Sequence, residues 1–191
     1  ALLNEVINPI PIAARLMIQW EEEVELIKPT DTPFVLNFGR FIGDGANNVI
    51  PDSVTLSGTL RVFDEAKRAQ ILAKVEEIAF KVCQQYGATC IPDIRHGYPM
   101  VENDLQVTKK TIQIAQQVLG EENVLSLDLR TTAEDFSYFL QKVPGVFFRV
   151  GVSNPEKGIV FPLHSARFDI DERALLTASK MMVAVVFDFL K

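Results

Sequence analysis

Histidine and cysteine are scarce in this chain, and their scarcity limits the sites that it can build by itself. Among 191 residues there are two histidines, His96 and His164, and two cysteines, Cys83 and Cys90. Two cysteines at this spacing form neither a disulfide framework nor a zinc-binding pattern. We therefore interpret them as buried thiols of a protein in a reducing compartment.

Positive charge is also scarce, and long apolar runs are absent. Lysine and arginine number 19 against 25 aspartates and glutamates, which gives a net charge of −6. Binding to nucleic acid needs clustered basic side chains, so we expect no nucleic-acid partner. No window reaches the ~18 uninterrupted apolar residues of a membrane span, so we expect no membrane partner either.

The beginning of the sequence lacks both an initiator methionine and the basic-then-apolar pattern of a signal peptide. We expect a cytoplasmic protein, and a chain that has been cut from a longer one. The composition is otherwise that of an ordinary globular protein, with 48% hydrophobic residues and 13 phenylalanines to fill a core.

The first hundred residues have the pattern helix, strand, strand, helix, strand. Apolar residues recur at helical spacing after Asn8, a natural N-cap, and the sequence KPTDTP ends this helix. Residues 34–43 and 53–63 have the apolar pattern of two strands. A second helix is predicted over 64–86, and a strand in ATCIPDIRHGYP. This order is that of a ferredoxin-like unit that lacks its first strand.

The second half has a different pattern, which follows a hinge at MVENDLQ. Helices are predicted over 104–119, 132–142 and 171–190, with a short strand in NVLSLDL. The apolar run at 145–152 is typical of a strand that is buried on both faces of a mixed sheet. The fold class predicted for the whole chain is therefore α+β followed by α/β.

Three segments carry a specific combination of residues. They are GDGANNVIPDSVTLSGTLRVFD at 43–64, TAEDFSYFLQKVPGVFFRVG at 132–151 and LHSARFDIDERALLTA at 163–178. In this order and spacing they resemble the peptidase M20 metallohydrolases, in particular the N-acyl-amino-acid amidohydrolase branch that includes the hippurate hydrolases. The resemblance runs over nearly the whole chain.

The resemblance implies a division into two parts. Residues 1–104 would be most of a ferredoxin-like lid, the part through which the family usually forms homodimers. Residues 105–191 would be the C-terminal part of a mixed α/β catalytic domain that holds two divalent ions, such as zinc, manganese or cobalt. Most metal ligands of the family, and its glutamate general base, lie in an N-terminal half that has no counterpart here.

Three residues match functional positions of the family. A lone histidine is ordinarily structural, but the motif around His164 implies a metal ligand. Asn48 and Arg61 have ordinary interpretations as a turn residue and a solvated strand charge. The resemblance implies instead that they bind substrate, and we expect their amide and guanidinium to converge across the hairpin on a carboxylate.

Three further residues are candidates for a supporting role near the site. Glu134 and Asp135 are expected in the first turn of a helix, where the helix dipole favours acidic side chains. Gly151 follows an apolar run and would let a substrate backbone come close. His96 is expected to be exposed or structural.

The function implied for the parent protein is metal-assisted hydrolysis of the amide bond of N-acyl amino acids or similar small amides. The chain alone is expected to be inactive, because it lacks the N-terminal ligands and would need that missing half as a partner. A second hypothesis is a non-catalytic module for dimerisation or small-molecule binding, and a third is an unrelated α+β domain. A lid without the hairpin at 34–63 would favour the third.

Overall fold

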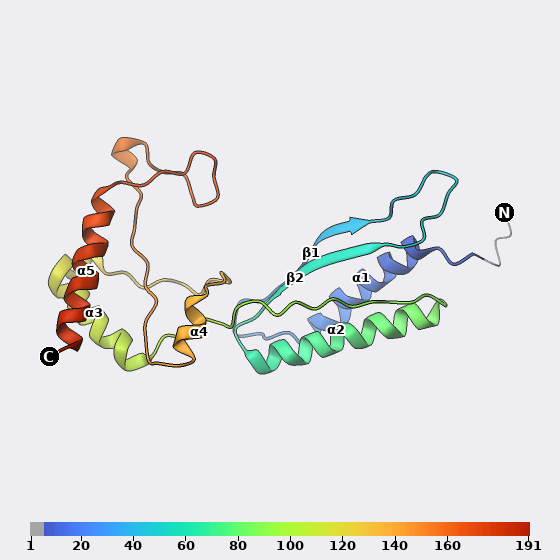
Figure 1. The fold of residues 1–191 in the computed structure, drawn as a ribbon, viewed down its shortest axis with the longest axis horizontal. Coiled ribbons are helices and arrows are strands. Elements are labelled where there is room, and N and C mark those ends of the chain that lie inside the picture. The colour runs from blue at the N-terminus through green and yellow to red at the C-terminus, as the bar shows by residue number, and fades with distance from the viewer. Residues whose placement is uncertain (1–5) are drawn as a thin grey trace. The chain divides into compact units, whose positions relative to one another are not determined.

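The computed structural model describes residues 6–191, which fold as two units (Figure 1). The first unit contains the described residues up to Met100 together with Leu129–Glu134. The second contains Val101–Asp128 and Asp135–Lys191. The assignment of 1–104 to a lid and 105–191 to a catalytic domain stays a prediction.

The first unit is built from two helices and a β-hairpin. In chain order its elements are α1 (Pro9–Glu25), β1 (Val35–Ile42), β2 (Thr55–Arg61) and α2 (Glu65–Gln85). Both helices begin where the sequence predicts. The Asn8 side chain accepts a hydrogen bond from the amide of Ile10 at 3.1 Å, and Asp64 accepts one from the amide of Lys67 at 2.8 Å. These bonds satisfy amides that have no partner within the helix.

The hairpin confirms the two predicted strands, whereas the third predicted strand does not form. Strands β1 and β2 pair antiparallel, with Val35 opposite Arg61 at one end and Ile42 opposite Thr55 at the other. A bulge interrupts the register between Phe38 and Arg40. The segment 88–99 has no strand assignment. The described part of the chain gives it no neighbouring strand with which to complete a ladder.

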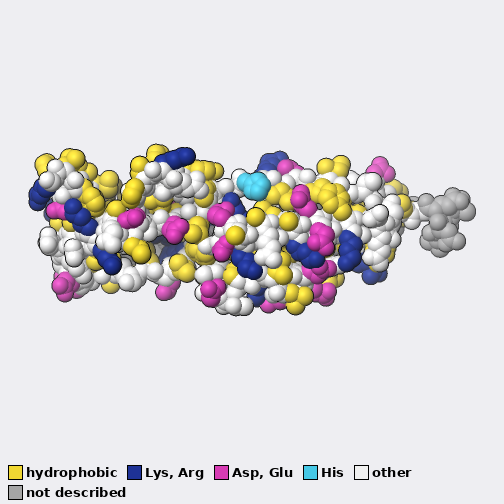
Figure 2. Space-filling view, turned by 90° about the horizontal axis from the view of Figure 1, so that it is seen from below, with side chains coloured by type: hydrophobic (Ala, Val, Ile, Leu, Met, Phe, Trp, Pro, Cys, Tyr) yellow, Lys and Arg dark blue, Asp and Glu magenta, His cyan; other side chains and the backbone are white. Residues whose placement is uncertain are grey.

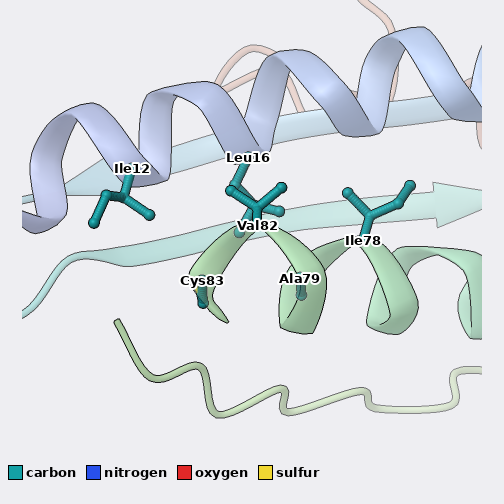
Figure 3. Packing of buried hydrophobic residues seen from close by; sticks show 6 residues of the cluster. All are labelled: Ile12, Leu16, Ile78, Ala79, Val82 and Cys83. Carbon is teal, nitrogen blue, oxygen red and sulfur yellow. The ribbon is translucent and has the colours of Figure 1, made fainter. Parts of the chain in front are cut away.

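Helices α1 and α2 lie against the same face of this hairpin, and the core of the first unit lies between them (Figure 1). Figure 3 shows Ile12 and Leu16 of α1 facing Ile78 and Val82 of α2. The Trp20 ring joins this core to the hairpin. It stacks on Phe38 with 5.5 Å between ring centroids, and its indole N–H donates to the Val75 carbonyl at 2.8 Å. The partly buried indole thus has a partner for its only donor.

The second unit contains helices but no described strand. Its elements are α3 (Leu105–Leu119), η1 (Glu121–Asn123), α4 (Phe136–Leu140), η2 (Pro155–Lys157) and α5 (Arg173–Phe189). Asp104 caps α3, as predicted, by accepting from the amides of Gln106 and Val107.

Helices α3 and α5 pack together through Lys110. Its ammonium lies 3.0 Å from an Asp188 carboxylate oxygen and 4.1 Å from the centre of the Phe189 ring.

The strands predicted at 123–129 and 145–152 are not formed in the second unit. A strand that is buried on both faces needs a paired strand on each side, and among the described residues neither segment pairs with another strand. Apolar side chains consequently remain on the surface, and Figure 2 shows hydrophobic side chains spread over one face of the molecule. The α+β content is confirmed, but the sheet expected for this half is not.

Candidate functional site

His164 lies in a tight turn of the second unit. The amide of Ser165 donates to the Pro162 carbonyl at 3.2 Å, which places His164 at the third position of a four-residue turn. Its φ angle is +67°, and among residues 6–191 it is the single non-glycine residue with positive φ. The residue is exposed. The turn therefore holds an imidazole at the surface in a backbone conformation that side chains disfavour.

A buried polar cluster joins the two ends of the loop that carries His164. The Asn154 amide nitrogen donates to the Asp171 carboxylate at 2.5 Å, and both side chains are buried. Lys157 and Arg173 add donors to the same carboxylate at 3.2 and 2.6 Å. The Arg173 guanidinium, then the Asn154 amide, hold the pKa of Asp171 well below its ordinary range.

Sequence reasoning missed this cluster. Asp171 was expected only as the start of the last helix, and Asn154 lies in a loop that was given no role. A signal for it was present in the sequence, because Asp171 precedes a helix and Asn154 precedes Pro155, and both are residue types that bond backbone amides at such places.

The chain offers one histidine to a metal rather than a complete site. Among residues 6–191, no three His, Cys, Asp or Glu side chains come together as metal ligands. An exposed imidazole at the tip of a loop suits one donor position, and divalent ions in hydrolases take at least three protein ligands. The donor set therefore fits His164 as one ligand of a metal, and the described residues do not complete such a site.

Asn48 lies in the loop that joins the two strands of the first unit. It lines an open pocket of about 480 Å³ together with Asn8, Ile10, Gly43 and the other residues of 45–51. Gly45 is required in this loop, because a Cβ there would lie 2.6 Å from the Val49 carbonyl oxygen. The pocket combines amide groups with aliphatic side chains, which suits a small neutral or weakly polar group.

Arg61 lies at the opposite end of β2, so the expected convergence with Asn48 is wrong. Asn48 follows Ile42 at the closed end of the hairpin, whereas Arg61 pairs with Val35 at the open end. At about 3.3 Å per residue, β2 alone separates the two ends by roughly 20 Å. The guanidinium of Arg61 instead donates to the carbonyl of Thr131. Within one hairpin, Asn48 and Arg61 therefore lie too far apart to bind the same carboxylate.

Glu134 and Asp135 precede a helix that is shorter than predicted. Helix α4 begins at Phe136, so Asp135 is its N-cap and Glu134 lies outside it. The Asp135 side chain makes no capping hydrogen bond. Gly151 lies in an extended segment where a Cβ would meet no atom within 4 Å. Packing therefore does not demand glycine there, and its role near a substrate stays a prediction.

The cysteines give no indication of thiolate catalysis. Both are free, Cys83 is buried and Cys90 is partly buried beside it. Burial, together with Cys83, raises the pKa of the Cys90 thiol to about 11. A thiol with such a pKa is almost fully protonated at neutral pH and is a poor nucleophile.

Comparison with known proteins identifies the family. The sequence model of peptidase family M20/M25/M40 matches residues 11–188, which is nearly the whole chain. The chain is a member of peptidase family M20/M25/M40. The resemblance drawn from its three sequence motifs is confirmed, and the chain corresponds to the C-terminal half of the family's proteins.

Two curated relatives and one solved structure show which proteins this M20 chain is similar to. It is 35% identical to thermostable carboxypeptidase 2 of Saccharolobus solfataricus, over 90% of the chain and 43% of that protein. It is 34% identical to the N-acetyldiaminopimelate deacetylase of Leuconostoc citreum strain KM20, over 88% of the chain and 42% of that protein. The chain thus spans less than half the length of the curated relatives that it matches.

The solved structure supports the fold alone. It is a dinuclear metal binding peptidase of the M20 family from Bacillus subtilis, 23% identical, with a TM-score of 0.68 over 95% of this chain and 46% of that one. The described helices and hairpin therefore belong to an M20-type α+β fold. No helix among residues 6–191 is both long and apolar enough to cross a membrane.

Proposed function

We propose that the protein to which this M20 chain belongs hydrolyses the amide bond of N-acyl amino acids or similar small amides, with two divalent ions such as zinc, manganese or cobalt. The observation that carries this proposal is the family match over residues 11–188, which includes the exposed, strained turn at His164. The names of its relatives support the reaction class, since one is a deacetylase of an N-acetylated amino acid. The dinuclear site of the Bacillus subtilis peptidase supports the metal count.

In this proposal His164 supplies a neutral ring nitrogen to one ion. Bound divalent ions polarise an amide carbonyl and make a water acidic enough to attack it. The planar guanidinium of Arg61 suits the free carboxylate of the amino-acid half, because it offers two parallel N–H donors. Asn48 is proposed as a separate substrate contact at the far end of the hairpin.

The remaining proposals concern the surroundings of the chain. We infer that the 191 residues alone are inactive, because one metal ligand cannot hold a dinuclear site, and that an N-terminal half completes it. A homodimer through the hairpin unit is proposed from the unpaired edges of a two-stranded sheet. A cytoplasmic location is supported by two free cysteines, which suit a reducing compartment. Glu134, Asp135 and Gly151 keep their proposed supporting roles.

The test compares the chain alone with a fusion to the N-terminal part of the Leuconostoc citreum deacetylase. Elemental analysis gives bound metal, and product assays on N-acetyl amino acids and on dipeptides give turnover with zinc, manganese or cobalt. We expect neither metal nor turnover from the chain alone, and both from the fusion, with N-acetyl amino acids preferred. The intact deacetylase is the positive control.

Substitution of the two histidines separates the metal ligand from a structural residue. In the fusion, His164→Ala should remove one equivalent of metal and the turnover, whereas His96→Ala should leave both unchanged. Arg61→Lys should raise KM more than it lowers kcat, because a single ammonium replaces a bidentate donor. Full metal content in the His164→Ala fusion, or stoichiometric metal with turnover in the chain alone, would contradict the proposal.

A second candidate function is a non-catalytic module that binds small molecules or dimerises. It is favoured by the pocket around Asn48, which needs no metal, and by the absence of a ligand cluster among the described residues. Saturable binding of an N-acyl amino acid to the chain alone, lost in Asn48→Ala, would favour it.

A further inference from the structure

The loop between residues 155 and 170 carries His164 at its tip and is closed at its base. Asn154 and Asp171, 17 positions apart, join across the base through the buried 2.5 Å hydrogen bond. The Asp171 amide also donates to the Val152 carbonyl at 2.9 Å. We call the Asn154–Asp171 pair the base clasp.

Further hydrogen bonds hold both residues of the base clasp. The Asn154 backbone exchanges two hydrogen bonds with Ile159, which lies within the loop, at 2.8 and 2.9 Å. On the leaving side, the amide and guanidinium of Arg173, the first residue of α5, donate to the Asp171 carboxylate. The loop therefore starts and ends at fixed points, and one end is the beginning of a helix of 17 residues.

A second contact closes the loop near its tip. The Arg167 guanidinium carbon lies 3.9 Å from the centre of the Phe161 ring, which is within the range of a cation–π contact. These two residues flank the turn at His164 on either side. The amide of Phe168 then donates to the Ser165 carbonyl at 3.0 Å, so a second turn follows directly.

The base clasp and the Phe161–Arg167 contact together account for the strained backbone of His164. A left-handed conformation is unfavourable at a residue other than glycine, and such a residue keeps it only where its surroundings enforce it. An exposed histidine has little packing of its own to enforce it. The enforcing contacts must therefore come from the rest of the loop.

We propose that the base clasp and the Phe161–Arg167 contact position His164, by holding the left-handed turn that presents its imidazole. Asn154, Asp171 and Arg167 are positioning residues in this view, and none of them contacts the substrate or a metal. The inference rests on the proposed function only for the use to which the imidazole is put. The geometry of the loop can be measured without any metal.

The experiment uses NMR of the isotope-labelled 191-residue chain. The Cα chemical shift of His164 reports its φ, and hydrogen exchange at the amides of Ser165 and Phe168 reports the two turns. Modification by diethyl pyrocarbonate is measured at His164, with His96 in the first unit as an internal reference. Asp171→Asn weakens the base clasp, because the amide keeps one acceptor oxygen but loses the charge, and Arg167→Met removes the tip contact.

We expect Asp171→Asn to speed exchange at Ser165 and Phe168 by about tenfold, the factor expected from a weakened hydrogen bond to a charged group. Arg167→Met should speed it by about threefold, the factor expected from the loss of an exposed cation–π contact. The His164 shift should move toward ordinary values, and the reactivity of His164 relative to His96 should change. Asp188→Asn is the matched control, because it removes the same charge and an ion pair of the same unit but lies outside the loop. Arg167→Lys should restore much of the wild-type behaviour.

The outcomes separate this inference from the proposed function. Unchanged Ser165, Phe168 and His164 signals in Asp171→Asn and Arg167→Met would overturn the positioning role, whatever His164 does with metal. If Asp171→Asn also exposes the amides of α3 and α5, the unit has unfolded and the exposed Arg167 decides: altered signals support the proposal and unaltered ones overturn it. Retention of metal by the His164→Ala fusion would defeat the proposed function and leave the loop geometry standing.

Discussion

The two units are similar in size but differ in how completely they bury their apolar residues. In the first, α2 buries Ile71, Ile78, Ala79, Val82 and Cys83. In the second, α5 is more apolar in sequence yet buries only Met181, and Phe187 on the same helix is 68% exposed. The first unit has a hairpin on which its helices pack, and the second has no described strand. An amphipathic helix is stabilised by what it packs against, so α5 gains less from packing within its unit than α2 does.

The largest expected effect tests this difference in the two cores. Ile78→Ala should destabilise the first unit by about 2–5 kcal/mol, because it leaves a cavity in a fully buried cluster. Met181→Ala should cost the second unit less than about 2 kcal/mol, since exposed neighbours can collapse around the gap. Urea unfolding of the first unit is followed by fluorescence of Trp20, the only tryptophan, and that of the second by NMR intensities of α5. Equal losses of stability in Ile78→Ala and Met181→Ala would contradict the difference between the two cores.

The same difference explains how much of the fold could be predicted. The N-cap Asn8, and the helix starts at Asp64 and Asp104, were identified because capping depends on a few adjacent residues. The strand predicted at 145–152 failed because a strand exists only with its neighbours, and no local pattern shows whether they are there. For the site, the motif around His164 indicated a ligand, but its left-handed φ could not be seen in the sequence, and the local signals at Asn154 and Asp171 did not show that the two residues pair. Those features depend on residues that only the folded loop brings together.

The error about Asn48 and Arg61 has a similar cause. Both belong to one hairpin motif, and 13 positions between them seemed to allow convergence. The register places the turn that carries Asn48 at one end of the hairpin and Arg61 at the other. The two residues are therefore close in sequence but separated by the length of a strand. Motif order predicts which residues share an element, and strand register decides which of them meet.

Acid should affect the second unit more than the first. The pKa of Asp171 is lowered below its ordinary value of 3.8 by Arg173 and then Asn154, so the folded state binds this proton less readily than the unfolded chain. Asp171 therefore stabilises the fold above about pH 4, and this contribution is lost as the pH falls below that value. In the first unit, the Glu23–Lys74 pair is more open to solvent and its effect is screened.

The measurement is urea unfolding at pH 7, 5 and 3, followed in both units. The midpoint for α5 should fall more steeply below pH 4 than the midpoint reported by Trp20. Asp171→Asn should flatten the pH dependence of the second unit, because the substituted amide does not titrate. A slope that stays the same in this variant would show that other carboxylates control the acid sensitivity.

Helix caps should give smaller and more equal effects. Asp64→Ala and Asp104→Ala each remove a side chain that accepts from backbone amides at the start of a helix, and each should cost about 1 kcal/mol. The two units should differ in where the loss of stability appears. Asp64→Ala should lower the midpoint of the whole first unit, whereas Asp104→Ala should mainly increase amide exchange in the first turn of α3. Asp64→Asn and Asp104→Asn are the controls, because asparagine caps equally well.

The smallest expected effect concerns positive φ angles, which the two units assign to different residues. The first unit places φ of +70° on Gly87, after α2, whereas the second places +67° on His164 in addition to positive φ on Gly120 and Gly158. Gly87→Ala should therefore destabilise the first unit by about 1 kcal/mol, because alanine disfavours this conformation. His164→Gly should stabilise the second by less than about 1 kcal/mol, and His164→Ala should not, because alanine keeps the strain. Urea unfolding of the three variants decides this. If His164→Gly is no more stable than His164→Ala, the turn is unstrained in solution. His164 then adopts its left-handed conformation without being forced into it by the contacts of the loop.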